Sequence, residues 1–115
     1  MINWYKKLYI GDNAKKREKK IIWRVNHRRP QKDVYLVTLA SNPENLLDIF
    51  PANMLLQKPL AFLCPTIVGI AVGYGEAAEL VRRLVDETYR RQGNADVRRY
   101  LKARLEEGSG KRTGG

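Results

Sequence analysis

The chain has 115 residues, of which 43% are hydrophobic, and a formal net charge of +10 at pH 7. This length suits one domain, and the hydrophobic fraction is too high for a disordered chain. Cys64 is the only cysteine in the sequence, which excludes an internal disulfide framework and a cysteine-based zinc cluster. The sequence shows no apolar segment of the length that a signal peptide or a membrane span requires, so we expect a cytoplasmic protein.

The charged residues are unevenly distributed along the chain. The first 33 residues contain 11 Lys or Arg and 3 acidic residues, a net charge of +8. Residues 34–79 have a net charge of −3, and the remainder has a net charge of +5. A nearly neutral, apolar middle segment that suits the core is therefore flanked by two basic segments that suit the surface.

Residues 14–27 fit an amphipathic helix with Asn13 as its N-cap. At about 100° per residue, the aliphatic residues fall on one side of this helix, and the basic residues fall on the other together with Trp23. A strand over 21–27 is the alternative, because apolar residues also alternate there. We favour the helix because it separates basic from apolar residues better. The preceding aromatic segment, WYKKLYI, is left unassigned.

Two strands are predicted at residues 34–40, VYLVTLA, and 66–72, TIVGIAV. Both segments are rich in β-branched or aromatic residues and lack charge, which is typical of strands buried on both faces. Turn-forming residues at 41–45 precede a shorter strand at 46–50, with a helix over 44–50 as the alternative. The segment 52–65 is expected to be irregular or to contain one helical turn.

The C-terminal part of the chain predicts two helices. Residues 76–91 place apolar side chains at a helical period, and Gly93 ends that helix. A last helix is expected at about 95–107. The predicted fold is therefore α+β in the order α-β-β-β-α-α, with a three-stranded sheet covered by helices on one face. Residues 1–107 form the single domain, and 108–115 form a flexible tail.

The segment Gly73-Tyr74-Gly75-Glu76-Ala77-Ala78 matches the G-x-G-x-x-A pattern of dinucleotide-binding turns. It lies between a predicted strand and a predicted helix, where free amides could bind a phosphate. Glu76 places a negative charge at that point, and no second strand follows to complete a βαβ unit. A tight strand-to-helix turn is the favoured interpretation, and a small nucleotide-binding protein stays as an alternative.

Other residues give weak signals for catalysis or metal binding. His27 is the only histidine, and it lies far from Cys64 in the sequence. Glu44 and Asp48 would share a helical face only if 44–50 were helical. We therefore expect no enzymatic activity, no cofactor and no metal. On the helix at 76–91, Asp86 and Glu87 lie four residues from arginines on both sides, which predicts surface ion pairs with Arg82, Arg90, Arg83 and Arg91.

The N-terminal basic segment has too few acidic residues to neutralise it internally. Such a charge cluster repels itself unless an anion binds, and polyphosphate backbones supply that anion. Trp23 within it suits stacking on a base. We predict nucleic-acid binding, to RNA or DNA, through Lys15, Lys16, Lys19, Lys20, Trp23, Arg24, Arg28 and Arg29. An anionic protein or membrane surface, and a protein-interaction module or homodimer, are the alternatives.

Four phrases of the chain, KLYIGDNAKK, VYLVTLASNPENLLDIF, VGIAVGYGEAAELV and DVRRYL, resemble a family of small bacterial proteins without assigned activity. The resemblance covers nearly residues 4–101. It implies a shared single-domain fold and no particular chemistry. The element order is also similar to that of the double-stranded-RNA-binding domain, in which lysines open the second helix; here that position reads Gly75-Glu76-Ala77-Ala78.

Overall fold

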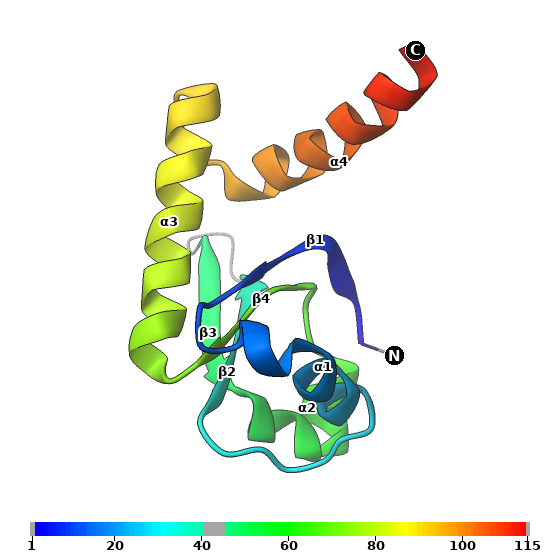
Figure 1. Ribbon diagram of the computed structural model, residues 1–115, viewed down its shortest axis with the longest axis vertical. Helices are drawn as coiled ribbons and strands as arrows, with labels where there is room; N and C mark the ends of the chain where they lie inside the picture. Colours follow the sequence, from blue (N-terminus) through cyan, green and yellow to red (C-terminus); the bar gives the residue numbers. More distant parts are fainter. Residues whose placement is uncertain (1, 41–45, 115) are drawn as a thin grey trace.

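The structure is a computed structural model that describes residues 2–40 and 46–114, with side-chain surroundings as far as residue 106. Within these ranges the chain forms one mixed sheet with helices on both faces (Figure 1). The strands are β1 Trp4–Ile10, β2 Val34–Leu39, β3 Leu47–Pro51 and β4 Ile67–Val72. The α-helices are α1 Glu18–Asn26, α2 Lys58–Phe62, α3 Tyr74–Gln92 and α4 Val97–Gly114. Two short 3₁₀ helices are η1 Lys15–Arg17 and η2 Ala52–Leu56.

The sheet has the strand order β1-β4-β2-β3. β4 pairs parallel with β1 and antiparallel with β2, and β2 also pairs antiparallel with β3. The two central strands are therefore the two segments that the sequence predicted to be buried. That prediction is confirmed, since Leu36, Val68 and Ile70 are fully inaccessible to solvent.

The two faces of the sheet carry separate apolar clusters. On one face, Leu36 of β2 packs in a cluster with Ile21 of α1. On the other face, Val37 packs with Leu80 of α3 and Leu101 of α4. Adjacent residues of one strand therefore point into different layers, which is why the strand lacks the polar face of a half-exposed sheet. The expectation that helices cover one face only is wrong.

The predicted three-stranded sheet is also wrong, because the segment WYKKLYI forms a fourth strand, β1. The register of β1 against β4 shifts between Trp4 and Tyr9, so buried and exposed residues do not alternate along it. This irregularity removes the period of two that identifies strands in a sequence. With β1 first, the observed order is β-α-β-β-α-β-α-α, and the similarity to the double-stranded-RNA-binding domain does not hold. The α+β class and the single domain are confirmed.

The N-terminal basic segment is helical, as η1 followed by α1, so the helix at 14–27 is confirmed and the strand alternative is wrong. The predicted cap is wrong. Ala14 precedes η1 without a side-chain cap, and the backbone amide of Asn13 donates a hydrogen bond to Glu76 Oε2 at 3.0 Å. The segment that leads into η1 is therefore attached to α3 by a contact that no local pattern reveals.

The remaining expectations concern the middle and the end of the chain. The strand at 46–50 is confirmed as β3, and the helical alternative is wrong for the residues of β3. The turn at 41–45, and with it Glu44, lies outside the described residues. Gly93 ends α3 in a left-handed conformation with φ of 75°, as predicted. α4 extends to Gly114, and the boundary at 107 and the flexibility of the tail stay predictions. In the described part of the chain, no helix has the length and apolar character needed to cross a membrane.

Candidate nucleic-acid interface

α1 is fixed to the body of the protein along one side. Ile21 and Val25 are 1% and 3% exposed and pack on the sheet. Trp4 of β1 donates a hydrogen bond from Nε1 to Asn26 Oδ1 at 2.8 Å, which attaches the end of the helix to the edge of the sheet. The opposite side of α1 is left facing solvent, and this is the side that carries the basic residues.

The eight predicted site residues lie on one continuous segment, and each except Arg24 is exposed. Lys15 and Lys16 lie on η1, and Arg28 and Arg29 follow the end of α1. On α1 itself, at about 100° per residue, Lys20, Trp23 and Arg24 fall within about 100° of one another, and Lys19 lies just beyond. The helix therefore gathers the predicted residues of α1 on its solvent side.

The protein itself neutralises few of these charges. Lys15 Nζ lies 3.6 Å from Asp12 Oδ1, and both side chains are exposed, so this ion pair contributes little. Arg24 Nη1 donates to the carbonyl oxygen of Pro30 at 3.0 Å, a contact that orients the guanidinium without cancelling its charge. Among the described residues, the segment 15–32 makes no other ion pair. A largely uncompensated positive surface remains.

Trp23 is 50% exposed despite its size. One face of its ring stacks on His27, with a centroid separation of 4.2 Å and an interplanar angle of 20°. His27 Nδ1 lies 2.8 Å from the carbonyl oxygen of Trp23, so Nδ1 carries the proton and donates it. This bond orients the His27 ring so that it packs against one face of the indole. A flat aromatic surface is thus presented among cations, the arrangement that stacks on unpaired bases.

Sequence reasoning omitted two cations from the candidate site. Arg17 ends η1, and Lys32 lies on the loop that leads into β2. Both line one small hollow with Lys20 and Arg24. Arg17, Lys20 and Arg24 are spaced by three and four residues, a helical pattern that was available in the sequence. The position of Lys32 depends on the fold of the loop and had no such signal.

The side chain of Glu76 lies beside the helix start at Gly73–Ala78. Glu76 accepts hydrogen bonds from the backbone amides of Val72 and Asn13, each at 3.0 Å. The approach of this carboxylate depends on Gly11, because a Cβ there would lie 2.0 Å from Glu76 Oε1. The side chain of Glu76 therefore fills the space beside this turn with a negative charge, which argues against a bound dinucleotide phosphate.

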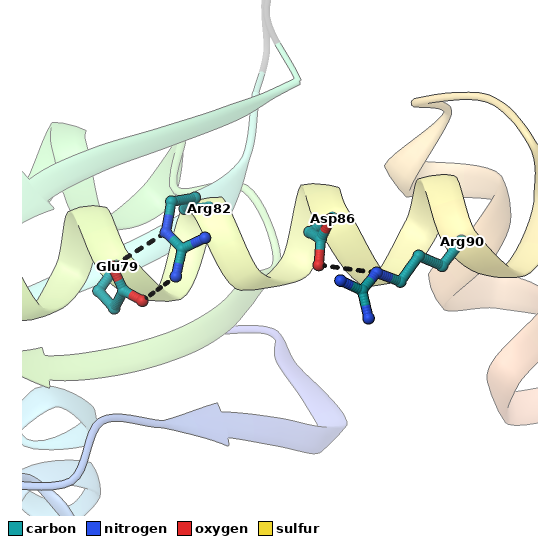
Figure 2. Close-up of polar contacts among 4 residues, drawn as sticks. All are labelled: Glu79, Arg82, Asp86 and Arg90. Atoms are coloured by element: carbon teal, nitrogen blue, oxygen red, sulfur yellow. Dashed lines mark hydrogen bonds and ion pairs between the residues drawn. The ribbon is translucent and has the colours of Figure 1, made fainter.

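The ion pairs predicted on α3 form only in part (Figure 2). Asp86 Oδ2 pairs with Arg90 Nε at 3.2 Å, as expected. Arg82, however, binds Glu79 through its Nε at 3.1 Å and through its Nη2, and it does not bind Asp86. Both pairs lie on the exposed side of α3, so they act as ordinary surface contacts.

Glu87 has partners that the sequence did not reveal. Its Oε2 accepts hydrogen bonds from the hydroxyls of Tyr9 on β1 and Tyr100 on α4, the latter at 2.6 Å. Arg104 Nη1 donates to the Tyr9 hydroxyl at 3.1 Å. These contacts join β1, α3 and α4, and they replace the predicted ion pairs of Glu87 with Arg83 and Arg91. This cluster of four side chains therefore links three elements that are far apart in the sequence.

The surroundings of this cluster shift the pKa values of Glu87, Tyr100 and Tyr9. Desolvation opposes ionisation of Glu87, but the hydrogen bonds from Tyr100 and Tyr9 and the charge of Arg104 outweigh it and hold the pKa of the carboxyl below 4.5. Desolvation, followed by the hydrogen bond to Glu87, raises the pKa of Tyr100 to about 12. The same two causes raise the pKa of Tyr9 further. The carboxylate and both phenols therefore keep one protonation state across the neutral range.

Among the described residues, no group of three or more His, Cys, Asp or Glu side chains lies close enough together to hold a metal ion. Cys64 is half-buried, and burial raises the pKa of its thiol. A thiol of this kind is a poor nucleophile at neutral pH.

An exposed apolar surface lies near the end of the basic segment. Phe62 and Leu63, at the end of α2, are 82% and 72% exposed. They line a groove of about 560 Å³ with Ile2 and with Arg28 of the basic segment. The sequence predicted an irregular segment or one helical turn at 52–65, where the structure has η2 and α2, and it gave no sign of this surface. Apolar side chains with such exposure are typical of contact surfaces.

Comparison of the chain with protein-family models, with curated proteins and with solved structures gave no match. The resemblance to small bacterial proteins without assigned activity therefore stays a prediction.

Proposed function

We propose that the protein binds nucleic acid, without enzymatic activity, through the exposed basic side of η1 and α1. The observation that carries the proposal is the lack of internal counter-charges: one exposed ion pair, from Lys15 to Asp12, serves the whole segment 15–32 in the described part of the chain. Cations on a fixed helix neutralise phosphates and release their counterions, which supplies affinity without strong sequence preference.

Trp23 supports the same proposal from a different direction. Its exposed ring is held by His27 among the cations, and a base that stacks on it gains about 1–3 kcal/mol. Because only unpaired bases offer a free face, this residue favours single-stranded RNA or DNA over a duplex. A cytoplasmic location, where such strands are accessible and Cys64 stays reduced, belongs to the same proposal.

The test is the salt dependence of binding to a single-stranded oligonucleotide. A variant with Lys15, Lys16, Lys19 and Lys20 replaced by Gln loses four positive charges from the proposed interface. Each phosphate contact contributes about 0.7 to the slope of log K against log salt, so the slope falls by as much as about 3. The measurement is fluorescence anisotropy at several salt concentrations.

The matched control removes four positive charges from elsewhere, by replacing Arg83, Arg91, Arg99 and Lys102 on α3 and α4 with Gln. These residues are exposed, and their helices pack on the face of the sheet opposite to α1. The control variant has the same net charge as the first variant. Equal slopes for the two variants would show that total charge, and not this surface, drives binding, and the proposal would then be rejected.

Self-association is the second candidate function, and the exposed groove at α2 favours it. Phe62 and Leu63 offer an apolar surface, and a second copy of the chain is the partner proposed for it. Sedimentation of the protein and of a Phe62→Ser variant tests this candidate. A dimer that dissociates on this change supports it, and a monomer at every concentration removes it.

A further inference from the structure

A small hollow lies between α1 and the loop that leads into β2. Its volume is about 130 Å³. Two of its lining residues, Ile21 and Val34, are apolar and almost fully buried, so they belong to the core beneath it. The rest of the lining is polar, and it includes four cationic side chains: Arg17, Lys20, Arg24 and Lys32.

No carboxylate lines this hollow among the described residues. Glu18 and Asp33 are neighbours in sequence of Arg17 and Lys32, yet neither side chain reaches it. None of the four cations makes an ion pair in the described part of the chain. Four like charges around so small a volume repel one another, and an anion that enters removes this cost.

Hydrogen bonds hold the wall of the hollow in place. Arg24 Nη1 donates to the carbonyl oxygen of Pro30 at 3.0 Å, and Gln31 Nε2 donates to that of Ile21 at 3.3 Å. The backbone amide of Gln31 donates to Asn53 Oδ1 at 2.8 Å, which attaches the loop to η2 as well. Because the loop is already fixed on both sides, a ligand would bind without paying the entropy of ordering it.

We propose that this hollow binds a phosphate monoester and, if the proposed function holds, that it takes the terminal phosphate of a nucleic-acid strand. A monoester carries a charge of about −1.5 to −2 at pH 7, whereas an internal phosphodiester carries a single negative charge. Four cations attract the monoester more strongly, and the guanidiniums of Arg17 and Arg24 match its oxygen geometry. Trp23 lies next to Arg24 on the same helix and offers a stacking surface for the terminal base.

The first experiment compares single strands of one sequence that end in a hydroxyl, a 5′-phosphate or a 3′-phosphate. Fluorescence anisotropy of the full chain should show one phosphorylated strand binding about tenfold more tightly than the hydroxyl strand, the gain expected from one charge-assisted contact. A variant with Lys20→Gln and Lys32→Gln should lose this preference. The control, with Lys16→Gln and Lys19→Gln, removes the same charge outside the hollow and should weaken all strands equally.

The second experiment uses inorganic phosphate and needs no nucleic acid. Titration should give saturable NMR shifts at the amides of residues 20–24 and 31–34 in the unmodified protein and in the control, and none in the variant of the hollow. Lowering the pH below about 6 should weaken this binding, because the phosphate then loses its second charge. Circular dichroism establishes that each variant is folded.

The outcomes separate the two proposals. Equal affinity for all strands, with strand binding intact, overturns the assignment to a terminal phosphate and leaves the proposed function standing. Phosphate shifts at the hollow without binding of any strand overturn the proposed function and support a phosphate site for another phosphorylated molecule. Absence of phosphate shifts at these amides overturns the site itself.

Discussion

The contact between Gly11 and Glu76 provides the sharpest test of the fold. A Cβ at position 11 would lie 2.0 Å from Glu76 Oε1 and 2.4 Å from its Cδ, so Gly11→Ala must displace the carboxylate. Gly11 does not have a positive φ, and its backbone therefore accepts alanine without strain. The whole effect of the substitution should come from the displaced side chain of Glu76.

The size of that effect follows from the hydrogen bonds that are lost. Glu76 accepts from the amides of Val72 and Asn13, each at 3.0 Å, and bonds to a charged acceptor contribute about 1.5–3 kcal/mol each. Asn13 is exposed, so water replaces part of its bond. We expect Gly11→Ala to lower the free energy of unfolding by about 2–3 kcal/mol. For a chain of this size, the melting temperature should fall by about 8–12 °C.

A double-mutant cycle isolates the contact. Glu76→Ala removes the same two bonds and should cost a similar free energy. In the Glu76→Ala background, Gly11→Ala has nothing left to displace, so its additional cost should be close to zero. Urea denaturation monitored by circular dichroism gives the four free energies. Additive costs would refute the reasoning, because they would show that Gly11 acts independently of Glu76.

Three further predictions concern other positions. Trp23→Ala should change the free energy of unfolding by less than about 0.5 kcal/mol, since the ring is half-exposed. The same change should weaken binding of a single strand about tenfold or more. Equal affinity of the variant and the unmodified protein in an anisotropy titration would contradict the role of the ring. Thr38 is fully buried, and its hydroxyl lacks a hydrogen-bond partner within the described residues. Thr38→Val should therefore stabilise the protein by about 1 kcal/mol, as measured by urea denaturation. A loss of stability would show that the hydroxyl does make a hydrogen bond in the folded protein. Desolvation works against the charge of Glu87, but hydrogen bonds from two tyrosines keep the pKa of its carboxyl lowered. The carboxylate therefore stabilises the folded protein above pH 4.5. This contribution is lost as the pH falls through the lower pKa of the folded state. Stability curves of the unmodified protein and of Glu87→Gln should therefore converge in acid, and parallel curves would contradict the assignment.

The sequence identified the elements whose patterns are local. VYLVTLA and TIVGIAV are strands because apolar β-branched residues follow one another, and 76–91 is helical because its apolar residues recur at a helical period. The basic helix was predicted because basic and apolar residues fall on opposite sides of it. In the structure its cations and Trp23 lie on the solvent side, as expected. These features depend on residues that lie close together in the sequence.

The missed features depend on residues far apart in the sequence. β1 was left unassigned because a register shift against β4 interrupts its alternation. Glu87 was assigned to arginines on its own helix, whereas tyrosines from β1 and α4 are its partners. The hollow that we propose as a phosphate site has both Lys32 and Arg24 in its lining, and the place of Lys32 depends on a loop that is bonded to η2. No periodicity in one segment encodes contacts of this kind.

The pairing of β1 has a consequence for biosynthesis. β1 finds its sheet partner only at Ile67–Ile70 of β4, and the Tyr5 hydroxyl donates a hydrogen bond to the carbonyl oxygen of Leu101, 96 residues further along the chain. During translation β1 therefore lacks its native partners until the residues of β4 and α4 have also left the ribosome. The pairing of β1 is a contact between residues far apart in the sequence, so we expect β1 to join the sheet later in folding than the hairpin of β2 and β3 forms.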